Sequence, residues 1–124
     1  MLSKKFRLPA SDFRKLKRFG RSVPGKLFVT SYLISSRRRG SDELERGPRF
    51  GFVVSKALAK RATERNLIKR RLSEAVWAFI KSNPELVQSR TVDFCFIARK
   101  ASLIGNYAQF TSEVNQVLPK ILEL

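Results

Sequence analysis

Six of the twelve residues from Lys60 to Arg71 are basic, and Glu64 is the only acid among them. A basic run of this kind is ordinarily the solvated face of a helix. Here, however, one acid is too few to offset the repulsion between cations that lie one helical turn apart. The segment therefore favours a polyanionic partner, because each phosphate that is neutralised releases condensed counterions.

Projecting residues 62–81 as a helix separates the apolar side chains from the polar ones. The apolar stripe consists of Ile68, Leu72, Ala75, Val76 and Phe79. The opposite flank consists of Asn66, Lys69, Arg70 and Ser73, with Arg65 at its border and Arg61 close by. The Asn66 amide donates and accepts hydrogen bonds at once, and Arg65 can fork onto a phosphate or stack on a base. We expect this flank to bind a folded RNA.

The charge of the whole chain supports the same class of partner. There are 26 Lys and Arg against 10 Asp and Glu, which gives +16. Residues 1–71 hold 21 basic and 5 acidic side chains, and residues 72–124 hold 5 of each, so the first part carries the entire excess. No apolar run approaches the ~20 residues of a transmembrane helix, and no signal-peptide core follows Met1. We expect a cytoplasmic protein that binds a polyanion and no membrane.

Catalytic residue types are scarce. The chain has no His and one cysteine, Cys95, so it can form neither an internal disulfide nor a Cys-His nucleophile. No pair of acids is spaced as a two-metal cluster requires. We expect no catalytic residue and no metal site, and we expect Cys95 to be a buried thiol inside a strand.

The elements that must position the basic flank follow from hydrophobic periodicity and turn residues. We expect helices at 12–19, 62–81 and 106–122 and strands at 27–35, 49–55 and 91–98. Ser11 or Asp12 is the expected N-cap of the first helix and Gly20 its end. The central helix should stop at Asn83-Pro84, and Pro119 should kink or shorten the last helix.

These elements predict a single α+β domain over residues 1–124. Pro24-Gly25 should form a turn, and residues 36–48 should form a flexible hairpin loop between the first two strands. In the strand at 49–55 we expect Phe50, Phe52 and Val54 on the core face. The small Gly51 and Ser55 on the other face would let a polymer approach closely.

The segment Arg65-Asn66-Leu67-Ile68-Lys69-Arg70-Arg71-Leu72 resembles the Arg-Asn-x-x-Lys-Arg signature of the protein subunit of bacterial ribonuclease P. Phe52-Val53-Val54-Ser55-Lys56 precedes it at the expected strand. Further similarities in order and spacing are Leu8-Pro9, Asp12-Phe13, Gly20 and Ile97-Ala98-Arg99. The resemblance covers most of the chain.

The resemblance implies a two-layer α/β sandwich, with helices packed on a small mixed sheet that has one more strand than the periodicity predicts. It also implies a left-handed β-α-β crossover through the central helix. The function implied is that of a subunit of an endoribonuclease which removes the 5′ leader of precursor tRNA. A catalytic RNA subunit, bound 1:1, would perform the hydrolysis with Mg²⁺ held mainly by RNA, and no DNA would be bound.

By position, the resemblance assigns two sets of contact residues. Those expected to bind the RNA subunit are Arg61, Arg65, Asn66, Lys69, Arg70 and Ser73. Those expected to bind the precursor-tRNA leader, in a cleft between the first helix and the sheet, are Phe13, Lys17, Ser31 and Lys56. Three positions depart from the family pattern: Leu67 stands where many members carry Arg, Lys17 replaces an aromatic residue, and Ser31 replaces a Tyr.

Several alternatives are compatible with the residues alone. Phe13 can stack on a leader base, or it can pack its helix onto the sheet. A structural ribosomal protein would share the size and charge. A DNA-binding regulator could use the central helix for recognition, but the paired short helices of a helix-turn-helix are missing before it. A protein nuclease would have to cleave RNA as an isolated chain.

Overall fold

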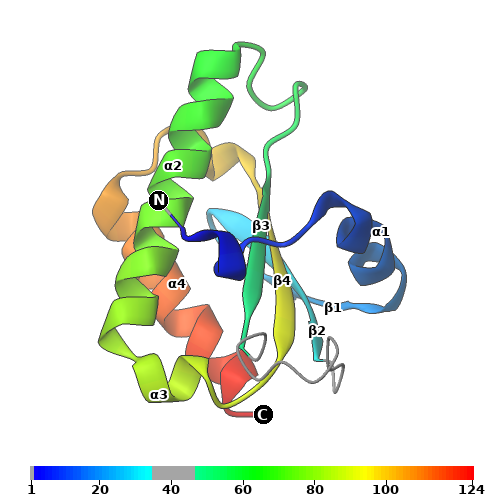
Figure 1. Cartoon of the computed structure of the whole chain (residues 1–124). Coiled ribbons are helices and arrows are strands. Elements are labelled where there is room, and N and C mark those ends of the chain that lie inside the picture. The colour runs from blue at the N-terminus through cyan, green and yellow to red at the C-terminus, as the bar shows by residue number, and fades with distance from the viewer. Residues whose placement is uncertain (1, 35–46) are drawn as a thin grey trace.

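The computed structural model of the protein describes residues 2–34 and 47–124 and consists of a four-stranded sheet with helices on both faces (Figure 1). The elements are, in chain order, η1 (Lys4–Phe6), α1 (Ala10–Phe19), β1 (Arg21–Pro24), β2 (Phe28–Ile34), β3 (Arg49–Val53), α2 (Ala62–Ser82), α3 (Pro84–Val87), β4 (Val92–Ala98), η3 (Lys100–Leu103) and α4 (Tyr107–Leu122). The expected α+β fold is confirmed.

The strands follow the order β1-β2-β4-β3. β1 pairs with β2 and β2 with β4 in antiparallel fashion, whereas β3 and β4 are parallel. The parallel pair is joined through α2 and α3, which is the crossover that the resemblance makes left-handed. The expected hairpin between β2 and β3 is wrong, because β4 lies between them. Side chains on both faces of β4 are buried, as is typical of a central strand. Residues 35–46 lie outside the described part of the chain.

Hydrophobic periodicity predicted none of the four short elements η1, β1, α3 and η3, two of which contain a proline. β1 ends in the predicted Pro24-Gly25 turn, but its side chains are exposed except for the half-buried Val23, so it shows little hydrophobic alternation. α3 follows directly on the predicted stop of α2 and carries Pro84 in its first turn. Both positions suit proline, which is tolerated on edge strands and in the first turn of a helix.

The main core lies between the sheet and the helices α2 and α4, which cover the same face (Figure 1). Phe50 and Phe94 stack with their ring centroids 5.1 Å apart, and Phe52 and Phe96 stack at 5.8 Å. The predicted apolar stripe of α2 is buried against this layer, and Leu72 is fully covered. These contacts confirm the core face of β3 and fix which flank of α2 remains in solvent.

α4 begins with a capping box, in which Asn106 and Gln109 exchange side chain to backbone hydrogen bonds of 2.9 Å. The helix continues through Pro119 to Leu122, so the expected shortening at Pro119 is wrong. Pro119 lies within the last turn, where the loss of a single backbone hydrogen bond is offset by burial of Leu118 and Ile121 on either side of it.

A smaller apolar cluster lies on the opposite face of the sheet, beneath α1. It consists of Leu8, Leu16 and Cys95, with Phe13 and Leu33 packed against it. The expected buried thiol is confirmed: Cys95 is 5% exposed, and burial raises its pKa to about 11. α1 ends at Gly20, as expected, where the Gly20 N–H donates to the Leu16 carbonyl.

A buried ion cluster holds α1 against the sheet. Arg49 of β3 donates to both carboxylate oxygens of Asp93 at 2.9 Å, and its Nη1 lies 3.1 Å from Oδ2 of Asp12 in α1. The expectation that Ser11 or Asp12 caps α1 is wrong. The helix begins earlier, at Ala10, and the Asp12 carboxylate points to Arg49 instead of to the backbone of its own helix.

Candidate nucleic-acid interface

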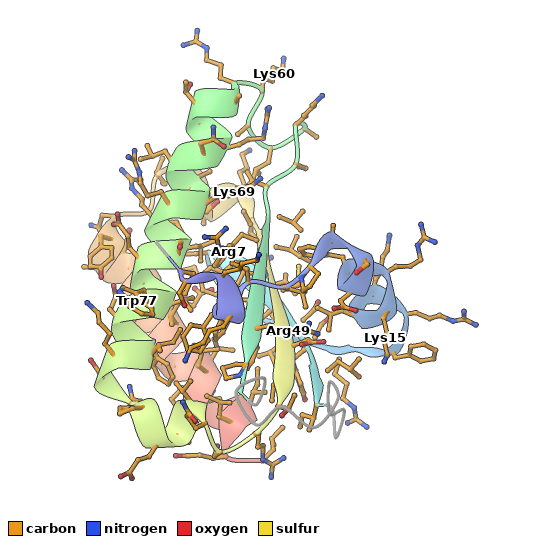
Figure 2. The ribbon with its side chains drawn as sticks, viewed as in Figure 1. Arg7, Lys15, Arg49, Lys60, Lys69 and Trp77 are labelled. Carbon is orange, nitrogen blue, oxygen red and sulfur yellow. The ribbon has the colours of Figure 1, made fainter. Side chains whose placement is uncertain are left out.

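The basic flank of α2 is exposed as the periodicity predicts. Because Ile68 and Leu72 bind the helix to the core, the opposite flank is directed into solvent over the first three turns. Arg61, Asn66, Lys69 and Arg70 are all exposed. In Figure 2, Lys60 and Lys69 mark this end of the helix, above Trp77.

Arg65 has a structural contact that the sequence did not reveal. It is half-buried, and its Nη1 donates to the carbonyls of Ala59 and Lys60, at 2.9 Å in each case. These bonds fix the turn that leads into α2. Arg65 therefore shapes the start of the basic flank, and its guanidinium is already engaged on one side.

Ser73 likewise has a partner within the chain. Its hydroxyl accepts a hydrogen bond of 3.3 Å from the backbone N–H of Leu2. Nε of Arg7 donates to the Leu2 carbonyl, and the Leu8 N–H donates to the carbonyl of Phe50 on β3 at 2.9 Å. Residues 2–8, which we call the strap, thus connect α2 to the outer edge of β3.

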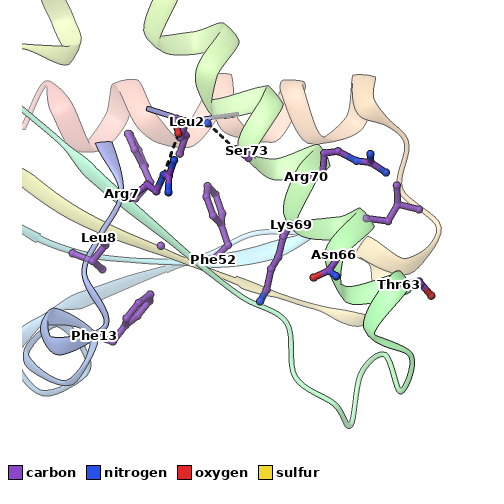
Figure 3. Close-up of a pocket in the computed structure, with 13 residues that line it drawn as sticks. Leu2, Arg7, Leu8, Phe13, Phe52, Thr63, Asn66, Lys69, Arg70 and Ser73 are labelled. Carbon is purple, nitrogen blue, oxygen red and sulfur yellow. Dashed lines mark hydrogen bonds between the residues drawn. The ribbon is translucent and has the colours of Figure 1, made fainter. Parts of the chain in front are cut away.

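A groove of ≈ 720 Å³ lies between α2, the strap and the edge of β3 (Figure 3). Its lining residues are Leu2, Arg7, Leu8, Phe13, Phe50, Gly51, Phe52, Thr63, Asn66, Leu67, Lys69, Arg70 and Ser73. The lining contains three cations and no acid. Four of the residues expected to bind the RNA subunit therefore share one groove with Phe13, which was expected to bind the leader, whereas Arg61 and Arg65 do not line it.

Phe13 packs its helix onto the sheet. A Cβ atom at Gly51 would collide with the Phe13 ring, so the ring lies directly over this glycine. Gly51 is buried, and the expectation that it leaves room for a polymer is wrong because Phe13 occupies that space. The ring is only half-buried, however, and its free side faces the groove.

The other residues expected at the leader are more dispersed. Lys17 is exposed on α1, and Lys56 is exposed just beyond β3. Ser31 of β2 lies on the α1 face of the sheet, where its hydroxyl is 3.2 Å from that of Ser22. None of these three lines the groove.

Sequence reasoning missed an apolar row on the same sheet face. Val53 and Ile97 are neighbours on β3 and β4, and Val29 is the partner of Ile97 on β2. Val53 and Ile97 are 38% and 40% exposed, because α1 does not reach this part of the sheet. Val53 lies two residues after Gly51, and Ile97 two residues after Cys95, so the sequence indicates that each pair shares one face of its strand. Only the strand order places Val53 and Ile97 side by side.

Comparison with known proteins decides the family. The family model described as Ribonuclease P matches residues 2–122. The chain belongs to the ribonuclease P protein family. The chain is therefore the protein subunit of the holoenzyme that removes the 5′ leader of precursor tRNA, and the ribosomal alternative is set aside. Its partners by family are the ribonuclease P RNA and precursor tRNA.

Solved structures of ribonuclease P proteins have the same fold. The Staphylococcus aureus protein is 26% identical, with a TM-score of 0.70 and 94% of each chain covered. The Thermotoga maritima protein is 21% identical, with a TM-score of 0.70, covering 92% of this chain and 96% of the other. No significant match was found among curated protein sequences. No helix within residues 2–34 and 47–124 is long and apolar enough to cross a membrane.

Proposed function

We propose that the exposed flank of α2 binds the RNA subunit of ribonuclease P, whereas α1 and the adjoining sheet face bind the leader of precursor tRNA. The observation that carries the proposal is the acid-free groove wall formed by Asn66, Lys69 and Arg70. These side chains project from a helix whose other side is packed against the core, so RNA binding costs little conformational entropy of the backbone. Arg61 adds a fourth exposed contact at the start of α2.

The leader surface is proposed on chemistry that suits a single strand. The half-buried ring of Phe13 offers a stacking surface, and Val53 with Ile97 continues an apolar platform across the sheet. The exposed amines of Lys17 and Lys56 supply charge for the backbone of the strand. Ser31 contributes a hydroxyl on the same face, in place of a larger stacking residue.

We assign the hydrolysis itself to the RNA subunit, with Mg²⁺ held mainly by RNA. Within the described residues no group of three His, Cys, Asp or Glu side chains is placed to hold a metal ion. The role proposed for the protein is to reduce phosphate repulsion between two RNAs and to position the leader. We further propose a 1:1 complex that acts in the cytoplasm and does not use DNA.

The test of the α2 assignment is to neutralise Lys69 and Arg70 together, as Lys69→Gln with Arg70→Gln. The matched control is Lys15→Gln with Arg18→Gln, which removes the same charge from exposed positions on α1. Affinity for the ribonuclease P RNA should fall in the first variant, and the slope of log K against log salt should decrease by about 1.5–2. Equal affinities and equal slopes for the two variants would remove α2 from the assembly surface.

A further inference from the structure

We infer that the groove between α2 and β3 is a receptacle for one unpaired nucleotide of RNA, with the base on the apolar floor and the phosphate on Lys69 and Arg70. The inference rests on the proposed function, since it takes α2 to face RNA. It goes further in naming what enters the groove: an extruded base instead of a continuous backbone.

The shape of the groove supports a single unit. At one end the strap joins the two walls. The Leu2 N–H donates to the Ser73 hydroxyl on α2, and the Leu8 N–H donates to the Phe50 carbonyl on β3. A polymer cannot continue beneath this bridge. Toward Thr63 no hydrogen bond among residues 2–34 and 47–124 joins the two walls, so a nucleotide can enter from that end (Figure 3). A volume of ≈ 720 Å³ falls within the range of small-molecule sites.

The residues that line the groove indicate that its occupant includes a base and not a phosphate alone. Phe52 places apolar surface between the cationic Lys69 on one side and Phe13 on the other (Figure 3). Leu67 adds a second apolar side chain to the lining. Leu67 is 37% exposed, whereas the other leucine and both isoleucines of α2 are buried. An apolar floor beneath positive walls is matched by a molecule with a flat uncharged face and an anionic group, as a nucleotide has.

The edge of β3 adds hydrogen-bonding groups at the floor. β3 is an outer strand, and within the described residues its free edge is paired only where the strap meets Phe50. Backbone groups of alternate residues point to the same edge, so the N–H and C=O of Phe52 are directed there as well. Together with the exposed Asn66 amide they can pair with the edge of a base.

The direct test is a titration of the full chain with adenosine 5′-monophosphate, followed by amide chemical shifts in NMR. Ribose 5-phosphate is the control that has the phosphate and lacks the base. The nucleotide should shift amides along the groove, from Phe52 and from Asn66 to Arg70, and should bind at least about five-fold more tightly than ribose 5-phosphate. Equal binding of the two probes, or shifts spread over the basic surface at large, would overturn the inference.

Two leucines provide matched variants. Leu67 and Leu103 are each 37% exposed, but only Leu67 lines the groove. Leu67→Ala should weaken nucleotide binding about five-fold or more, and Leu103→Ala should leave it unchanged. If both substitutions, or neither, change the affinity, the nucleotide does not occupy the groove.

The holoenzyme shows which RNA supplies the nucleotide. If Leu67→Ala weakens binding of the RNA subunit, the base comes from that subunit; if it weakens binding of leader-bearing precursor tRNA alone, the base comes from the leader. Either outcome supports the inference, and no change in both affinities contradicts it. The proposed function fails separately, if neutralising Lys69 and Arg70 leaves assembly with the RNA unchanged.

Discussion

Arg49 lies between Asp93 and Asp12 and contacts both carboxylates, and replacing it with Met should destabilise the fold strongly. Arg49 is 6% exposed and Asp93 2%, so the substitution leaves a carboxylate buried without its bidentate partner. Removing one member of a buried pair costs about 3–5 kcal/mol. For a domain of this size that corresponds to a decrease in Tm of roughly 10–20 °C.

Urea unfolding followed by fluorescence of Trp77, the only tryptophan, measures this loss. Arg21→Met, which removes an exposed arginine from β1, is the control and should change stability by less than about 0.5 kcal/mol. Arg49→Met combined with Asp93→Leu should regain most of the loss, because the carboxylate that loses its bidentate partner is then removed from β4 as well. A loss below about 1 kcal/mol for Arg49→Met, or a double variant as unstable as the sum of the two single variants, would refute the reasoning.

Three further substitutions test separate contacts. Glu113→Gln should lower stability by roughly 1–2 kcal/mol in urea unfolding, since this carboxylate accepts from three consecutive backbone N–H groups, those of Lys26, Leu27 and Phe28. Gly51→Ala should displace the Phe13 ring and weaken leader binding while RNA-subunit affinity stays the same, as measured by fluorescence anisotropy with labelled RNAs. For Cys95, burial raises the pKa of the thiol from its ordinary value of 9.0 to about 11, so the free energy of unfolding should be unaffected by this group below pH 9 and should fall as the pH rises toward 11. Cys95→Ala should remove that fall from the profile of stability against pH.

Much of the fold was accessible from the sequence because burial imposes periodicity. α2 spans Ala62–Ser82 where 62–81 was expected, and its apolar stripe is buried as projected. Strand order was not accessible in this way. Adjacent strands in the chain usually pair, and only the two-sided burial of β4 explains why it separates β2 from β3.

The candidate site was predictable in residue type but not in geometry. Charge and helical projection identified Lys69 and Arg70, which do line the groove. They gave no indication that Arg65 and Ser73 have partners within the chain, because those partners lie in a turn and in the strap, which have no periodicity. The position of Phe13 over Gly51 depends on how α1 docks, and the Arg49 cluster that docks it joins three elements that lie far apart in the sequence.

The most direct test of the division between the two surfaces is leader dependence in the reconstituted holoenzyme. Affinity is measured for precursor tRNA with and without its leader, using wild-type protein, Phe13→Ala, and Lys69→Gln with Arg70→Gln. We predict that Phe13→Ala reduces the gain in affinity conferred by the leader about five-fold or more without changing affinity for the RNA subunit. The α2 variant should lower affinity for the RNA subunit and leave the gain from the leader unchanged. If both variants lower both affinities in equal proportion, the leader and the RNA subunit do not occupy separate surfaces, and the account is contradicted.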